Sequence, residues 1–172
     1  TSLIPTYGAV RTRLQDTVLG AGTSSDFNSA EGVLFAEISS VNMINDFQRI
    51  SIGTSDGNFT DNVGLRYNTN GTTVTYQFRV NNVYQSELTA SINQTDVNKL
   101  ACVWKVNRFE LWLNGVKVGE DTSGSVPSAN SFNSLFYGKT SVISEGLFGK
   151  TSQIQVFKTA LTDAELQTLT TI

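Results

Sequence analysis

The sequence predicts an all-β fold, a sandwich of two antiparallel sheets with a short C-terminal helix. Short apolar runs alternate with Thr, Ser, Asn and Gly, a mixture that favours strands and turns. The pairs Asp56-Gly57, Asn70-Gly71 and Asn114-Gly115 each lie between alternating segments, where such pairs form hairpin turns. Strand candidates follow one another at short intervals, as is typical of a sandwich or a barrel.

The strand candidates are short and show the alternation of a half-buried strand. They cover residues 32–41, 48–54, 62–68, 72–80, 83–91, 98–107, 109–114, 116–120, 132–138 and 146–158. A short candidate at 10–14 precedes a Gly- and Ser-rich loop at 20–25. We expect one domain, with residues 1–25 as a lead-in segment with an edge strand, 26–160 as the sandwich and 161–172 as the helical end. Because the chain begins with Thr, we expect it to be a piece of a longer protein.

The segment 99–118 is the most informative, because it reads as two successive hairpins. Leu100, Cys102 and Trp104 fall on one face of a strand, and Ala101 and Val103 fall on the other. Since both faces are apolar, this strand belongs in the middle of a packed sheet. The sole cysteine, Cys102, has no partner for an internal disulfide and is expected to be a small buried hydrophobic residue.

The C-terminal segment carries helix signals. Thr162, followed three residues later by Glu165, forms a capping box pattern, and Leu161, Leu166 and Leu169 give an apolar stripe. A helix this short is marginal alone, so it is expected to dock on the sandwich.

Composition excludes several functions. The formal net charge is -3, and no run of Lys or Arg provides the positive surface of a nucleic-acid or anionic-membrane binder. No apolar stretch approaches the roughly 20 residues that insert into and span a bilayer. The chain contains no His, which removes His-based triads and imidazole acid–base catalysis. Glu31 and Glu37 are interpreted as solvated carboxylates at the strand ends and not as a catalytic pair. We therefore do not expect an enzyme.

One strand candidate presents the groups that bind sugars. Trp112 is flanked at two-residue spacing by Glu110 and Asn114, and sugar sites combine aromatic rings with carboxylate and amide groups. A second polar row includes Gln77 and Arg79. If the two rows lie together on one sheet, these five residues form a ligand-binding site. The alternative is that Trp112 packs under a neighbouring loop while its polar neighbours face water.

A metal site is a further candidate. Asp56, Asn58 and Asp61 offer hard oxygen ligands of the kind that Ca²⁺ prefers. The spacing matches no stringent motif, and such loops also serve simply as turns.

Three segments, 1–13, 99–118 and 149–169, together resemble the laminin-G-like, concanavalin A-like lectin/glucanase domains found at the ends of phage tail and fibre proteins, in particular of phages that infect Bacteroidetes. The Ala-Leu-Thr-Asp-Ala-Glu-Leu sequence at 160–166 carries much of this resemblance. It implies a jelly roll with one concave sheet that recognises glycans or other cell-surface ligands. The Glu-x-Asp-x-x-Glu strand of the glucanases in this superfamily is absent here.

The resemblance therefore implies a non-catalytic recognition module of an extracellular or virion-surface protein. Its expected partner is a glycan or cell-surface polysaccharide, and a homo-oligomer within a fibre would multiply a weak single-site affinity. A structural spacer or oligomerising module without a ligand is the alternative, and a polysaccharide-active enzyme is the third.

Overall fold

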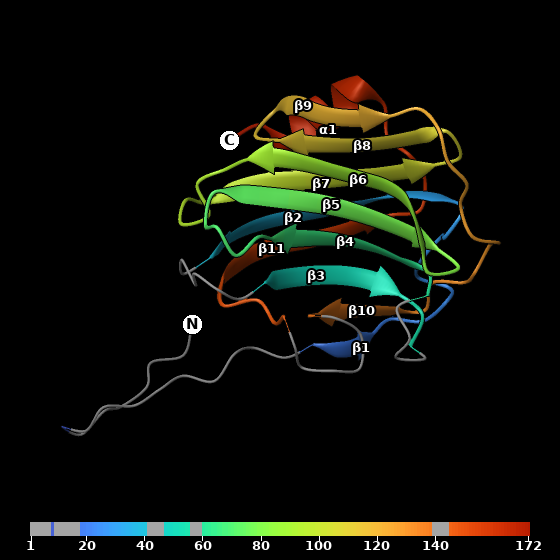
Figure 1. Cartoon of the computed structure of the whole chain (residues 1–172), viewed down its shortest axis with the longest axis horizontal. Coiled ribbons are helices and arrows are strands. Elements are labelled where there is room, and N and C mark those ends of the chain that lie inside the picture. Colours follow the sequence, from blue (N-terminus) through green and yellow to red (C-terminus); the bar gives the residue numbers. More distant parts are fainter. Residues whose placement is uncertain (1–7, 9–17, 41–46, 56–59, 139–144) are drawn as a thin grey trace.

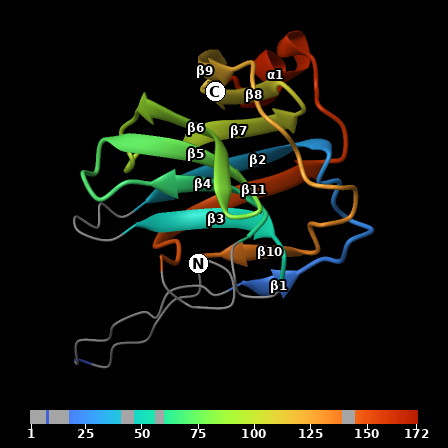
Figure 2. The same ribbon diagram turned by 45° about the vertical axis from the view of Figure 1, so that its right-hand side comes forward.

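The computed structural model describes residues 8, 18–40, 47–55, 60–138 and 145–172, and these form two antiparallel sheets packed face to face (Figures 1 and 2). Sheet A has the strand order β1-β10-β3-β4-β5-β6, and sheet B has the order β11-β2-β7-β8-β9. The predicted all-β sandwich is confirmed.

The strands lie close to the segments with alternating sequence. Sheet A consists of β1 (Leu19–Ala21), β10 (Ser134–Tyr137), β3 (Gln48–Gly53), β4 (Asn62–Tyr67), β5 (Thr73–Val80) and β6 (Val83–Ser91). Sheet B consists of β11 (Gly149–Phe157), β2 (Glu31–Ser40), β7 (Asn98–Lys105), β8 (Arg108–Leu113) and β9 (Val116–Asp121).

The start of the described chain differs from the expectation. Residues 20 and 21, expected in a loop, belong to β1, because the backbone around Leu19 pairs with Phe136 of β10 at the edge of sheet A. The register shifts between Leu19 and Ala21, which is consistent with the positive φ of Gly20. The strand candidate at 10–14 lies outside the described residues.

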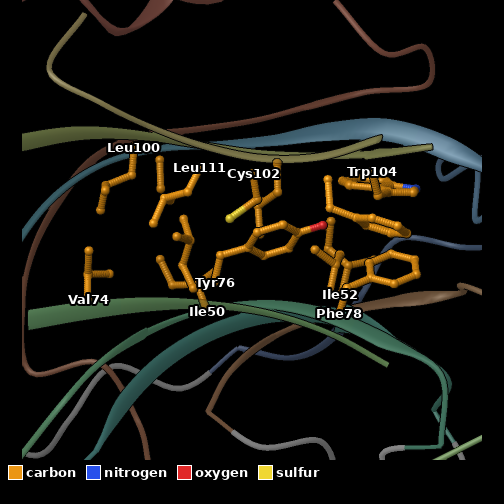
Figure 3. Close-up of a cluster of buried hydrophobic side chains, with 14 of the residues drawn as sticks. Ile50, Ile52, Val74, Tyr76, Phe78, Leu100, Cys102, Trp104 and Leu111 are labelled. Atoms are coloured by element: carbon orange, nitrogen blue, oxygen red, sulfur yellow. The ribbon is translucent and has the colours of Figure 1, made fainter. Parts of the chain in front are cut away.

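The main core lies between the inner faces of the two sheets, as Figure 3 shows. From sheet A, Tyr76 and Phe78 point toward sheet B, where Cys102 and Trp104 of β7 meet them. These side chains are completely buried. The expectation for Cys102 is confirmed, and burial raises the pKa of its thiol, so it stays neutral. The sandwich therefore rests on close packing of large aromatic and aliphatic side chains.

The buried hydroxyl of Tyr76 has its hydrogen-bond partner on the opposite sheet. The Tyr76 hydroxyl, on sheet A, donates a hydrogen bond of 2.9 Å to the Val103 carbonyl oxygen on sheet B. Burial raises the pKa of Tyr76, which keeps the hydroxyl protonated as a donor. This hydrogen bond links the two sheets directly across the core.

The helix α1 (Asp163–Thr170) covers part of the outer face of sheet B. Its predicted capping box is confirmed: the Glu165 carboxylate accepts the Thr162 N–H at 2.8 Å, and the Thr162 hydroxyl accepts the Glu165 N–H at 3.4 Å. Leu166 is completely buried in a second apolar cluster with outward residues of three strands. The other buried members of this cluster are Val33, Phe35, Ala101, Val103 and Trp112. Within the described ranges, no helix is long and apolar enough to cross a membrane.

A group of charges fastens the start of α1 to sheet B. The Glu110 carboxylate, on β8, accepts hydrogen bonds from Arg108 Nε at 2.9 Å, Trp112 Nε1 at 2.9 Å and Lys117 Nζ at 3.1 Å. Arg108 and Lys117 also reach the Asp163 carboxylate of α1, at 3.1 Å and 2.9 Å. Each cation therefore bridges a strand carboxylate and a helix carboxylate.

Burial by itself would raise the pKa of Glu110, but the hydrogen bonds from Arg108, Trp112 and Lys117 outweigh burial and lower it. The Glu110 side chain is only 6% exposed, so these bonds are shielded from water. The ionised carboxylate is therefore the form that holds this network together.

We expect Leu166→Ala to lower the free energy of unfolding by about 3 kcal/mol, because it leaves a cavity between α1 and sheet B. Gln167→Ala is the matched control on the same helix, where an exposed side chain is removed and the change stays within about 0.5 kcal/mol. Urea unfolding followed by tryptophan fluorescence measures both. Equal stability of the two variants would contradict the packing described here.

We expect Glu110→Gln to lower the free energy of unfolding at neutral pH by about 2 kcal/mol, since charge-assisted hydrogen bonds are lost. Because the folded-state pKa of Glu110 lies below its unfolded value, its contribution is complete above the unfolded pKa and disappears as pH falls through the folded pKa. The stability gap between the wild type and the variant should therefore narrow as pH falls below the ordinary carboxyl pKa of 4.5, and close once pH is below the folded-state pKa.

Glu120→Gln is the control for this experiment. Glu120 also contacts Lys117, at 3.3 Å, but its side chain is 58% exposed, so removing its charge should change stability by less than about 0.5 kcal/mol. A pH-independent gap for Glu110→Gln would show that the variant acts through packing and not through the carboxylate charge.

Candidate functional site

The five residues predicted to bind a ligand do not come together. Glu110, Trp112 and Asn114 belong to β8 and the turn after it, in sheet B, whereas Gln77 and Arg79 belong to β5 in sheet A. Both rows point outward, so the core separates them. The expectation that they share one shelf is wrong, because alternation along a strand defines its faces but does not identify the sheet that the strand joins.

Trp112 is not an exposed platform. Its side chain is 5% exposed, packs in the cluster below α1 and donates its indole N–H to Glu110. Asn114 has a structural role in the hairpin turn. Its Oδ1 accepts the Lys99 N–H at 2.9 Å, and its positive φ of 49° is the backbone conformation that the turn requires. Trp112 is covered, as the alternative expected, but by the helix and not by a loop, and its neighbour Glu110 is buried instead of facing water.

The other two predicted residues lie on the outer face of sheet A. In Figure 1, β3 to β6 face the viewer, and α1 lies behind β8 and β9. We call the outward residues of these four strands the polar face. They form three cross-strand rows: Arg49, Arg66, Thr75 and Thr89; Ser51, Gly64, Gln77 and Glu87; Gly53, Asn62, Arg79 and Tyr84.

Gln77 organises the side of this face nearest β6. Its Nε2 donates to the Tyr84 hydroxyl at 3.0 Å and to Glu87 Oε1 at 3.0 Å. Arg79 donates to the same hydroxyl through Nη2, and its guanidinium carbon lies 4.0 Å from the centroid of the Tyr84 ring. The amide therefore holds an aromatic ring and a carboxylate side by side on β6.

The same Gln77 side chain carries an unsatisfied atom. It is 1% exposed, and its Oε1 has no hydrogen-bond partner among the described residues. A buried acceptor without a partner costs about 1–3 kcal/mol of stability. Such a group is tolerated where it orients other side chains, which here are Tyr84 and Glu87.

Two arginines lie side by side in the first row, with different surroundings. Arg49 is 4% exposed and pairs with Glu145 at 2.9 Å; burial lowers the pKa of Arg49, and Glu145 opposes that effect. Arg66 is 17% exposed and lies across the Phe47 ring, with its guanidinium carbon 4.4 Å from the ring centroid. Arg49 is thus part of the scaffold, while Arg66 reaches the surface.

The accessible part of the polar face combines several kinds of group. Tyr84 is 41% exposed and the Glu87 side chain is 45% exposed, with the partly exposed Arg66 and Arg79 beside them. An aromatic ring next to charged donors and acceptors is suited to the flat apolar faces and hydroxyl edges of sugars.

Arg66, Tyr84 and Glu87 were not part of the predicted site. The alternation of the segments 62–68 and 83–91 gives Arg66 and Glu87 an outward position that was visible in the sequence. Tyr84 lies three residues from Glu87, so alternation alone would place it on the inner face, and the register shift between Phe78 and Arg79 pairs it with Arg79 instead. What was not visible is that β4 and β6 flank β5 and bring these residues next to Gln77.

Two of the predicted calcium ligands, Asp56 and Asn58, lie outside the described residues. The third, Asp61, accepts the Asn81 N–H at 2.7 Å through Oδ1, so it serves a turn. Across the described ranges, no three His, Cys, Asp or Glu residues are grouped so that they could hold a metal ion.

Several solved structures share this fold. The CBM40 module of the Ruminococcus gnavus IT-sialidase superposes with a TM-score of 0.69 at 15% identity, over 92% of this chain and 97% of that chain. A SAP-like pentraxin from Limulus polyphemus gives a TM-score of 0.64 at 18% identity, over 87% of this chain and 72% of that chain. A leech intramolecular trans-sialidase gives 0.67 at 17% identity, over 92% of this chain and 27% of that chain.

These identities are low, so the likeness to the three structures establishes the fold alone. No curated protein matches the sequence. The family described as the concanavalin A-like lectin/glucanases superfamily (Laminin_G_3) matches residues 39–167, which include most of both sheets and the start of α1. The chain therefore belongs to the Laminin_G_3 family of concanavalin A-like domains.

Proposed function

We propose that this domain is a non-catalytic module that binds glycans on the polar face of sheet A. The observation that carries the proposal is the preassembled group of Tyr84, Glu87 and Arg79 around the buried amide of Gln77. It offers a ring for stacking and fixed polar groups for sugar hydroxyls. Sheet B has part of its outer face covered by α1 instead.

The neighbours in fold support the glycan as ligand class. The Ruminococcus gnavus module is a carbohydrate-binding module, and its structures include complexes with α2,3- and α2,6-sialyllactose. A non-catalytic role agrees with the absence of His from the chain. On the polar face, Glu87 is hydrogen-bonded to the Gln77 amide, which favours a binding role for this carboxylate.

We propose that the module belongs to a phage tail or fibre protein, or to another extracellular protein. On a virion surface it would meet host polysaccharide. The sequence resemblance of the segments 1–13 and 149–169 to phage fibre domains supports this setting. The accessible site is small, so single-site affinity is weak, and several copies within a fibre would raise it through effective concentration.

We expect Tyr84→Ala to weaken glycan binding by about fivefold or more, because a stacking surface worth on the order of 1 kcal/mol is lost and Arg79 loses its partner. A glycan array with bacterial and algal polysaccharides identifies ligands, and isothermal titration calorimetry then gives the affinities. Parallel runs with Ca²⁺ and with a chelator test whether residues of the segment 56–61 bind a metal ion.

Gln153→Ala is the matched control, because Gln153 is an exposed residue of β11 in the other sheet. Its affinity should equal that of the wild type. An equal loss of glycan affinity in both variants would contradict a binding site on the polar face. A folded domain that binds nothing on the array would instead support a structural spacer or an oligomerising module.

A further inference from the structure

We propose that the glycan bound at the polar face carries a carboxylate, and that Arg66 is the residue that contacts it. This inference rests on the proposed function and adds the chemical class of the ligand. Two observations support it, the charged groups of the polar face and the hydrogen-bond donors of Arg66.

The polar face gathers three arginines on a chain that is acidic overall. The chain has a formal net charge of -3. The described part of the polar face brings together Arg49, Arg66 and Arg79, with the Glu87 carboxylate near Arg66 and Glu145 paired with Arg49. Arg49 and Arg66 are also direct cross-strand partners, an arrangement in which like charges repel. An anion bound beside them would relieve that repulsion.

The three arginines differ in what they can offer a ligand. Arg49 is 4% exposed and held by Glu145. Arg79 is stacked on Tyr84 and donates to its hydroxyl, so it positions the ring. Arg66 is therefore the arginine best placed to meet an anion.

The guanidinium of Arg66 is held in one orientation, but not all of its N–H groups donate hydrogen bonds. Its Nε donates to Asn68 Oδ1 at 3.0 Å, and the Phe47 ring lies against its plane. Its Nη2 lies 3.9 Å from Glu87 Oε1, beyond hydrogen-bond distance. Within the described part of the chain, neither Nη atom makes a hydrogen bond. A planar, pre-oriented pair of donors is suited to two carboxylate oxygens.

Glu87 is the residue that we expect to determine selectivity between acidic and neutral ligands. Gln77 holds its carboxylate near the Arg66 Nη2 atom, where it repels an incoming anion and accepts hydroxyls from a neutral sugar. Removing this charge while keeping the shape should therefore favour acidic ligands over neutral ones. Arg66 and Glu87 are thus expected to shift selectivity in opposite directions.

The test compares 3′-sialyllactose with lactose, which differ by one acidic sugar, and adds a galacturonate oligomer as a second carboxylate source. The wild type should prefer 3′-sialyllactose or the galacturonate oligomer over lactose, and added salt should weaken that preference. Arg66→Gln should reduce acidic-ligand affinity by about tenfold, a larger loss than the one it causes for lactose. Glu87→Gln should increase acidic-ligand affinity by about threefold.

Arg66→Lys separates charge from geometry, since it keeps the charge and loses the planar fork, and it should bind the acidic ligand with intermediate affinity. Circular dichroism confirms that each variant is folded. Unchanged acidic-ligand affinity in Arg66→Gln would overturn the proposal, as would equal loss for lactose. Preference for neutral glycans would overturn it while leaving the proposed function intact, whereas no binding of any glycan would overturn the proposed function itself.

Discussion

The two-residue period of β3, β4 and β5 is the constraint on which this molecule depends. Each strand sends apolar side chains such as Ile50, Leu65 and Tyr76 into the core, so the alternate positions must face outward. The core therefore determines where the polar face lies. A shift of β4 by one residue would turn Arg66 into the core, and a shift of β5 would turn Gln77 inward, in each case exposing the apolar side chains of that strand, which the packing energy prevents.

The two sheets use their outer faces differently. Sheet B has apolar residues on both faces, because β7 alternates Ala101 and Val103 with Cys102 and Trp104. Its outer face would expose a large apolar surface, and α1 covers it through Leu166. The charge network around Glu110 fixes the start of that helix. Among the described elements, sheet A alone keeps a polar outer face without a helix over it.

The polar face is organised around side chains that are themselves buried. Gln77 is almost inaccessible, yet it holds Tyr84 and Glu87 in place, and Arg49 fills the opposite side while paired with Glu145. Preorganisation of this kind reduces the entropy lost when a ligand binds. The Nε2 atom of Gln77 makes both of these contacts, while its Oε1 has no hydrogen-bond partner among the described residues.

Local sequence features of this protein predicted much of the fold. The Asn114-Gly115 turn has the expected positive φ at both residues, the Thr162–Glu165 capping box begins the helix, and Cys102 is buried. Each of these depends on residues close together in the chain, or on an alternation that one strand displays by itself. For the same reason the outward position of Gln77 and Arg79 was predictable, because it follows from the period of β5 alone.

The composition of the candidate site was decided only in three dimensions. Trp112 looked like a sugar platform because its own strand places it between Glu110 and Asn114, but a helix more than 50 residues later in the chain covers it. Conversely, Arg66, Gln77 and Glu87 meet because β4, β5 and β6 are neighbours in sheet A. The sequence by itself determined the strands, their two faces and the capped helix, since these are set by local period and turn chemistry. The tertiary structure decided which sheet each strand joined and which outer face remained open, because strand pairing and helix docking are contacts between distant segments.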